Sequence, residues 1–125
     1  MPNLTDRGLD AFSSVLYKGQ AFQLEETDAF HRWLGSLADR RAMTRIVDRL
    51  KRVSNGNFGD VRPARSGVSE IRIDYGPGYR IYFFRRGKPL VVLLCGGDKK
   101  TQKADIAAAI RLKDEIERSD RDKAV

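Results

Sequence analysis

Two stretches of alternating polar and apolar residues place charged side chains where they could form a site on one face of a sheet. Glu70 and Arg72 alternate with isoleucines in one stretch, and Arg80 and Tyr82 alternate with apolar residues in the next. Because successive side chains of a strand point to opposite faces, these four residues should share one open face of a sheet. Two arginines and a tyrosine on one open face, with a carboxylate nearby, make this face a candidate site. The alternative, which we weight equally, is a solvated face with cross-strand Glu–Arg pairs, each contributing roughly 0.2–1 kcal/mol.

A second candidate is the segment 96–102, Gly-Gly-Asp-Lys-Lys-Thr-Gln, which lies between an apolar strand and the start of a helix. It combines flexible backbone, the ammonium groups of Lys99 and Lys100, and free N–H groups at a helix N-terminus, all of which favour an anion. The spacing of a Walker loop is absent. An ordinary strand-to-helix turn with surface lysines is the alternative, at even odds.

Other kinds of catalytic or metal site find no support in the sequence. His31 is the only histidine, so a Ser–His–Asp or Cys–His arrangement is not expected, and we place this residue on a helix surface. Cys95 lies in an apolar strand and is interpreted as a core residue, and Trp33 as part of a helical core stripe. No cluster of cysteine and histidine has metal-ligand spacing, so neither a metal nor a cofactor is predicted.

The residues before the strands predict two helices that would support this sheet. A short first strand is expected at residues 17–24, and the first helix then begins at a cap, Thr27 or Asp28, followed by apolar residues at helical spacing. Asp39 is the expected cap of a second helix, which turns apolar residues inward and arginines outward and ends at residues 55–57. The join between the helices is short, which predicts an antiparallel helical hairpin.

From residue 61 onward the apolar residues recur at every second position, which is typical of strands. Strands are predicted, in order, at residues 61–65, 68–74, 79–85 and 90–95. The intervals between them are too short for crossover helices, so the strands should run antiparallel. Thr101 is the expected cap of a last helix. The predicted fold class is α+β, with an N-terminal strand and a helical hairpin packed on a curled antiparallel sheet, and a C-terminal helix.

Length and composition are typical of a single globular domain. The chain has 125 residues, of which 41% are hydrophobic and 33% charged. We divide the domain, residues 1–125, into an extension at 1–15, a core at 17–113 and a frayed tail at 114–125. No apolar run is long enough for a membrane helix and no signal-peptide pattern is present, so we expect a cytoplasmic location and no membrane partner.

The net charge of +7 is unevenly distributed along the chain. Residues 62–100 carry nine basic and three acidic side chains, whereas residues 1–30 carry two basic and five acidic ones. A positive field of this kind attracts nucleic acid or an acidic protein. The simpler interpretation is a solvated basic surface that keeps the protein soluble.

Five blocks of the sequence, taken in order, resemble the RelE/ParE superfamily of toxins. The match is closest to its phage-derived, HigB-like branch, the addiction module killer proteins. The blocks lie at residues 30–34, 56–61, 67–73, 75–82 and 96–102. The resemblance covers residues 17–113 and implies a microbial-RNase-like fold. It also implies the toxin of a type II toxin–antitoxin system, inhibited by an antitoxin of the helix-turn-helix kind encoded beside it.

The reaction that the resemblance implies is metal-independent cleavage of messenger RNA on the ribosome. The RNA 2′-OH attacks the neighbouring phosphate and leaves a 2′,3′-cyclic product. The implied catalytic residues are Arg72, Arg80, Lys99 and Lys100, and the implied RNA-binding residues are Tyr82, Arg65 and Gln102. Glu70 and Asp98 are the nearby carboxylates that could act as acid or base, and the general base is not assigned.

The resemblance also leaves a second function open. ParE-type relatives inhibit DNA gyrase without enzymatic activity, and gyrase is therefore the alternative partner. Under either function, we expect an acidic or amphipathic segment of the antitoxin to cover the basic residues of 62–100, because exposed positive charge would bind RNA nonspecifically.

Overall fold

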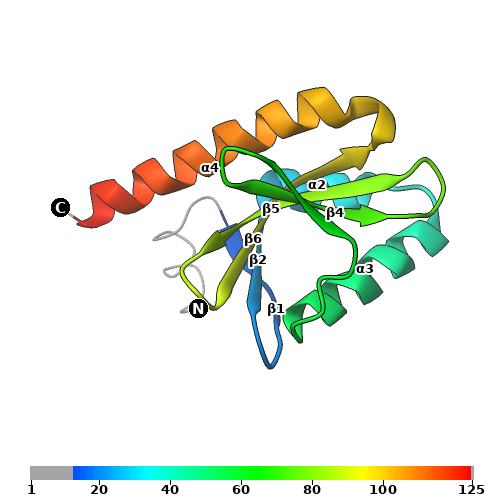
Figure 1. The fold of residues 1–125 in the computed structure, drawn as a ribbon, viewed down its shortest axis with the longest axis horizontal. Coiled ribbons are helices and arrows are strands. Elements are labelled where there is room, and N and C mark those ends of the chain that lie inside the picture. The colour runs from blue at the N-terminus through cyan, green and yellow to red at the C-terminus, as the bar shows by residue number, and fades with distance from the viewer. Residues whose placement is uncertain (1–12, 125) are drawn as a thin grey trace.

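The structure, a computed structural model that describes residues 13–124, is built around one six-stranded sheet (Figure 1). The strands are β1 (Ser13–Lys18), β2 (Gln23–Thr27), β3 (Val61–Arg65), β4 (Val68–Ile73), β5 (Tyr79–Arg86) and β6 (Leu90–Asp98). Their order across the sheet is β1-β2-β6-β5-β4-β3. The four strands predicted after residue 61 are confirmed. β6 is longer than predicted because Gly96 and Gly97 continue the ladder opposite Ile81 and Arg80.

One pair of neighbouring strands is parallel, which the sequence did not predict. β2 runs parallel to β6, whereas the other neighbouring pairs are antiparallel. A parallel pair needs a long connection, and here two helices and three strands lie between the two partners in the chain. The α+β class is confirmed, and the sheet is mixed and mostly antiparallel.

A β-hairpin replaces the single strand predicted at residues 17–24. The chain reverses between β1 and β2, where the Gly19 N–H donates to the Phe22 carbonyl at 2.9 Å. The turn rests on Ser54, whose carbonyl accepts from the Phe22 N–H at 2.9 Å and would overlap a Cβ at Gly19. Apolar residues on both sides of this turn made the segment resemble one strand. The predicted extension at residues 1–15 falls mostly outside the described residues, and 13–15 belong to β1.

Two helices, α2 (Asp28–Ser36) and α3 (Arg40–Ser54), cover one face of the sheet. Both predicted caps are confirmed: Thr27 Oγ1 accepts from the Phe30 N–H at 3.0 Å, and Asp39 Oδ1 accepts from the Arg41 N–H at 2.9 Å. Asn55 ends α3, also as predicted. α2 packs mainly on β6 and β2 and makes few contacts with α3, so the helical hairpin is more open than expected. The core on this face contains Leu24, Phe30, Ile46, Leu50, Val53, Ile71, Ile73, Ile81, Phe83, Val91 and Leu93.

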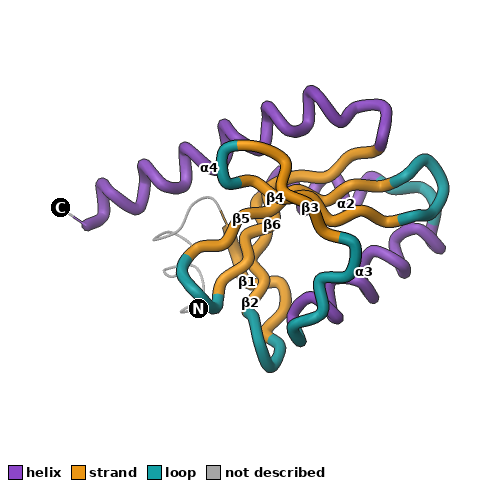
Figure 2. The backbone as a smooth tube through the Cα atoms, in the orientation of Figure 1, coloured by secondary structure: helices purple, strands orange, loops and turns teal. Residues whose placement is uncertain are grey.

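The last helix, α4 (Gln102–Ala124), crosses the opposite face of the sheet (Figure 2). It follows a single 3-10 turn, Lys99–Thr101, whose N-cap is Asp98; Thr101, the predicted cap, lies three residues further on. The segment expected to be a frayed tail is helical and belongs to α4, which continues to Ala124. It is held to the sheet by the buried Ile116 and by a contact between Asp120 and Arg86. A second core lies under the helix and contains Val68, Tyr82, Phe84, Val92, Leu94, Cys95, Ala109 and Ile116.

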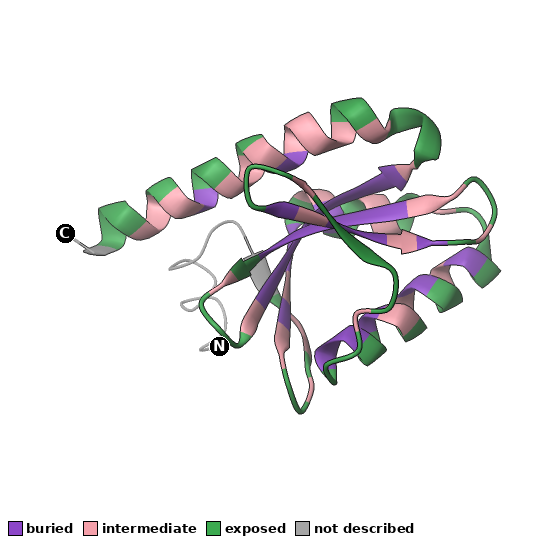
Figure 3. Cartoon of the chain, in the orientation of Figure 1, coloured by how far each residue is buried: buried purple, intermediate pink, exposed green. Residues whose placement is uncertain are grey.

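Because helices cover both faces, the middle strands of the sheet are buried on both sides (Figure 3). The sequence assigned the side chains of β4 and β5 to the correct faces, but the face expected to be open lies under α4. Cys95 is a core residue as predicted, and burial raises the pKa of its thiol to about 12. None of the helices within residues 13–124 is long and apolar enough to cross a membrane.

Substitution of Gly96 tests how closely α2 packs on β6. A Cβ at this position would overlap the Trp33 ring, so Gly96→Ala should lower the free energy of unfolding by about 1–3 kcal/mol through overpacking. Gly35, within α2, is the matched control because a Cβ there would have no atom within 4 Å. Gly35→Ala should raise the free energy of unfolding by up to about 1 kcal/mol. Urea unfolding followed by circular dichroism measures both, and equal stabilities would contradict this account.

Candidate functional site

The centre of the candidate site is the buried carboxylate of Glu70 on β4. Its Oε2 accepts a hydrogen bond from Arg80 Nη1 at 3.2 Å and lies 3.3 Å from Arg72 Nε. Its Oε1 accepts from Gln102 Nε2 at 3.3 Å, at the start of α4. The two guanidinium groups meet because the register of β4 and β5 sets Arg72 opposite Arg80. One carboxylate therefore holds two arginines and the start of the last helix together.

The two arginines differ in how far they reach solvent. The Arg80 side chain is 7% exposed, and its Nε has no hydrogen-bond partner among the described residues. The Arg72 side chain is 29% exposed. A buried donor without a partner is costly, so an anion that reached Arg80 would be bound favourably. Arg72 supplies the accessible positive charge and Arg80 a second charge behind it.

Tyr82 shares this face but is covered by the protein. Its side chain is fully buried in the core under α4, and its hydroxyl has no partner among the described residues. Burial first, and then the charge of Glu70, raise the pKa of Tyr82 well above its usual range. The expectation that Tyr82 lies on an open face of the sheet is therefore wrong for this structure. The sequence placed Tyr82 on the correct face but did not reveal that α4 covers it.

A cleft of about 270 Å³ opens beside the arginines. Its lining consists of Asp60, Arg72, Ile73, Asp74, Gly78, Arg80 and Lys99. Three residues predicted as catalytic thus meet in one cleft, although they come from β4, β5 and the turn before α4. The left-handed backbone of Gly78, with φ of 80°, lets the β4–β5 loop pass beside the Cβ of Lys99.

Two carboxylates in the cleft, Asp60 and Asp74, were not chosen from the sequence. A signal for Asp74 existed, since it continues the alternation of Glu70 and Arg72 along the strand. Asp60 had no such local signal. It reaches the cleft because β3 pairs with β4, where the Arg72 N–H donates to the Asp60 carbonyl at 2.9 Å.

The segment 96–102 differs from the open phosphate cradle considered from the sequence. Asp98 Oδ1 accepts from the N–H groups of Lys100 at 2.8 Å and Thr101 at 3.2 Å, so the protein's own carboxylate occupies the start of the helix. Gly96 and Gly97 belong to β6 and permit close packing, because a Cβ at Gly97 would overlap the Asp105 carboxylate. Lys99 lines the cleft, whereas Lys100 is exposed and is absent from its lining.

Two other residues considered from the sequence lie away from the cleft. Arg65 is exposed at the far end of β3 and pairs with Val68, about 13 Å from Arg72 along the strand. His31 is on the surface of α2, as predicted, where its Nδ1 lies 3.1 Å from Glu26 Oε2.

Arg49 of α3 braces the wall of the cleft from behind and was also not identified from the sequence. Its Nη1 donates to the Arg72 carbonyl at 2.9 Å, and its Nη2 donates to the carbonyls of Phe58 and Asp60 at 3.2 Å. The tight approach needs Gly59, since a Cβ there would lie 2.7 Å from the guanidinium. Partial burial lowers the pKa of Arg49. The Arg49 side chain thus holds the backbone of both Arg72 and Asp60 in place.

The arrangement is suited to binding an oxyanion. Arg72 and Lys99 offer accessible positive charge, Arg80 is more deeply buried, and the carboxylates of Asp60 and Asp74 line the same opening. Within residues 13–124, no group of three histidine, cysteine, aspartate or glutamate side chains is placed to hold a metal ion.

Comparisons with known proteins identify relatives. The family described as "Phage derived protein Gp49-like (DUF891)" matches residues 32–115. An uncharacterized protein of Haemophilus influenzae (strain ATCC 51907 / DSM 11121 / KW20 / Rd) is 46% identical over 94 residues, which is 75% of this chain and 95% of the relative. No solved structure shows significant similarity to the chain.

The buried charge cluster can be tested by neutralising its anion. Glu70→Gln should lower the free energy of unfolding by about 3 kcal/mol, because Arg80 then keeps a buried charge without a counter-charge. The double variant Glu70→Gln/Arg80→Met should lose less, since no unpaired buried charge remains. Asp74→Asn, at an exposed carboxylate of the same cleft, should change stability by less than about 0.5 kcal/mol. Denaturant unfolding measures all three, and a Glu70→Gln variant as stable as the parent would refute the account.

Proposed function

Because the chain belongs to the Gp49-like family of phage-derived proteins, which is related to the toxins of toxin–antitoxin systems, we propose that it is a type II toxin that cleaves messenger RNA on the ribosome. The observation that supports this function is the cleft where Arg72, Arg80 and Lys99 converge. Such a set of fixed cations fits a phosphodiester whose negative charge grows during reaction.

In the proposed reaction the RNA 2′-oxygen forms a bond to the adjacent phosphorus, and the bond from phosphorus to the 5′-oxygen breaks. A base takes the proton of the 2′-OH, and an acid gives a proton to the leaving 5′-oxygen. Arg72 and Lys99 neutralise the phosphorane oxygens, and Arg80 adds a charge that Glu70 holds in place. No metal ion takes part in this scheme.

The proton acceptor is best sought among the carboxylates that line the cleft. Glu70 already faces three donors, from Arg72, Arg80 and Gln102, and is better suited to positioning the arginines than to receiving a proton. Asp98 uses Oδ1 to cap the turn before α4. Asp74 lines the cleft and makes no hydrogen bond or ion pair within residues 13–124, so we assign it the role of base. The Lys99 ammonium is the proposed acid.

A toxin of this kind must be inhibited by a partner protein, and we propose an antitoxin with an acidic segment that covers the cleft. The exposed cations at the cleft would otherwise attract RNA without selection. Neutralisation by such a segment places its carboxylates against Arg72 and Lys99, the same groups that would hold the substrate phosphate.

The nuclease function is tested with Arg72→Gln in cells that express the protein under an inducible promoter. The parent should arrest growth and produce new transcript 5′ ends in primer extension, and Arg72→Gln should lower the cleavage rate roughly 100-fold or more. Arg118→Gln, at an exposed arginine on α4, removes the same charge away from the cleft and should cleave normally. Growth arrest with intact transcripts would exclude the nuclease.

One observation favours a second function, the non-enzymatic inhibition of DNA gyrase. The only histidine of the chain pairs with Glu26 on the α2 side, so the cleft has no imidazole to act as a base near neutral pH. Supercoiling assays with purified gyrase distinguish the two functions. Inhibition by the parent and by Arg72→Gln alike, with no RNA cleavage, would support the gyrase inhibitor.

A further inference from the structure

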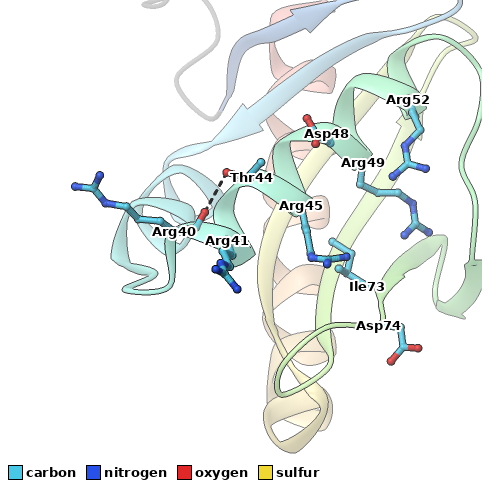
Figure 4. A pocket seen from close by; sticks show the side chains of 9 residues that line it. All are labelled: Arg40, Arg41, Thr44, Arg45, Asp48, Arg49, Arg52, Ile73 and Asp74. Carbon is cyan, nitrogen blue, oxygen red and sulfur yellow. Dashed lines mark hydrogen bonds between the residues drawn. The ribbon is translucent and has the colours of Figure 1, made fainter.

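A second and larger cavity, of about 780 Å³, lies between α3 and the end of β4. We call it the arginine groove, and Figure 4 shows its lining: Arg40, Arg41, Thr44, Arg45, Asp48, Arg49, Arg52, Ile73 and Asp74. Arg41, Arg45, Arg49 and Arg52 recur at intervals of four, four and three residues, which puts them along one face of the helix over about 17 Å. The adjoining face of α3 carries the buried Ile46 and Leu50.

Most of this charge is not used by the fold. Arg49 is held by three carbonyl groups, as described above, but Arg41, Arg45 and Arg52 are exposed and form no ion pair with a carboxylate within residues 13–124. In Figure 4, Arg45 and Arg49 extend from α3 toward the sheet side of the groove, whereas Arg40 points away. Neighbouring guanidinium groups on one helix face repel one another, and a bound polyanion would offset that repulsion.

The arginine groove and the cleft meet at the end of β4. Ile73 and Asp74 line both cavities. Together the two linings carry eight arginine or lysine side chains and three aspartates. An RNA chain whose reacting phosphate lies beside Arg72 and Lys99 would reach the arginines of α3 by passing the end of β4, at Asp74.

Arg45 adds a feature that suits a nucleobase. Its guanidinium lies over the ring of Tyr75 at 4.6 Å, and the Tyr75 hydroxyl donates to Asp39 Oδ2 at 3.2 Å, which holds the ring in place. The guanidinium plane is thus preorganised, and bases splayed out of a single strand stack on such planes. A carboxylate of an acidic protein gains nothing from a stacking plane, so this geometry favours RNA over an acidic protein segment.

We propose that the arginine groove binds the phosphate backbone of single-stranded RNA, with a base stacked on Arg45. The proposal rests on the proposed function, because it extends the path of the same substrate beyond the cleft. It assigns Arg41, Arg45 and Arg52 to substrate binding and leaves the reacting phosphate to Arg72, Arg80 and Lys99.

The test is fluorescence anisotropy of a short labelled single-stranded RNA whose 2′-oxygens are methylated, so that cleavage is blocked. Binding is measured at several salt concentrations. Arg41→Gln/Arg45→Gln should bind about tenfold more weakly. The slope of log K against log salt should fall in magnitude by about 1.4, because Arg41 and Arg45 would each neutralise one phosphate, Arg45 through its edge while its plane stacks on the base. Both positions are exposed, so the variant should keep its fold, which circular dichroism checks.

Two further variants make the test specific. Lys51→Gln/Arg118→Gln removes two exposed charges outside the groove lining, one on α3 and one on α4, and should keep the parent's affinity and slope. Arg45→Lys keeps the charge but loses the planar group, so RNA binding, which also loses the stacked base, should fall several-fold and by more than binding of a polyglutamate peptide.

Equal losses in both double variants would overturn the proposal, because the effect would then be one of net charge. Unchanged binding by Arg41→Gln/Arg45→Gln would also overturn it. Tighter binding of polyglutamate than of RNA, lost in that variant, would assign the groove to an acidic protein partner instead. The methylated RNA reports binding alone, independently of cleavage. If it binds through the groove while transcripts in cells stay intact, the nuclease function is excluded but RNA binding by the groove is supported.

Discussion

The rest of the structure depends on one buried carboxylate that compensates two guanidinium groups. Arg80 can remain almost fully buried only because Glu70 lies beside it, and β4 can pair with β5 in its register only if Arg72 and Arg80 tolerate each other across the strands. Gln102 extends the same cluster to the start of α4. The contacts of Glu70 with Arg72 and Arg80 thus join two strands and also fix the positions of two cations in the cleft. Arg49 holds the backbone of Arg72 by donating to its carbonyl.

The two cores meet in β6, and its end explains how helices can approach the sheet from both sides. Gly96 admits the Trp33 ring of α2, and Gly97, the next residue, admits Asp105 of α4 on the other face. Side chains at either position would push a helix away from the strand. Lys99, which lines the cleft, follows two residues after Gly97, so the glycines that admit a side chain from each helix also precede a cation of the cleft.

Sequence reasoning succeeded where the signals are local. Thr27 and Asp39 could be identified as helix starts because their side-chain oxygens accept the free N–H groups of the first turn. The alternation around Ile71 and Ile81 likewise indicated which side chains face the core. It failed where contacts join distant segments. The Gly19 turn depends on Ser54, the burial of Tyr82 depends on α4, and Asp60 reaches the cleft only through strand pairing. The resemblance grouped Arg72, Arg80, Lys99 and Lys100, of which Lys100 does not line the cleft. The contacts of Arg49 were not predicted, since backbone carbonyl groups leave no pattern in a sequence.

The parallel pairing of β2 with β6 has a consequence for the order in which the chain can fold. β6 is the last strand in the sequence, yet it lies between the β1–β2 hairpin and the β5–β4–β3 ladder. During synthesis, these two parts share no hydrogen-bonded edge until β6 has left the ribosome. Contacts between segments so far apart close late, because loop-closure entropy opposes them. The complete sheet, and with it the cleft, therefore assembles only after β6 has been synthesised.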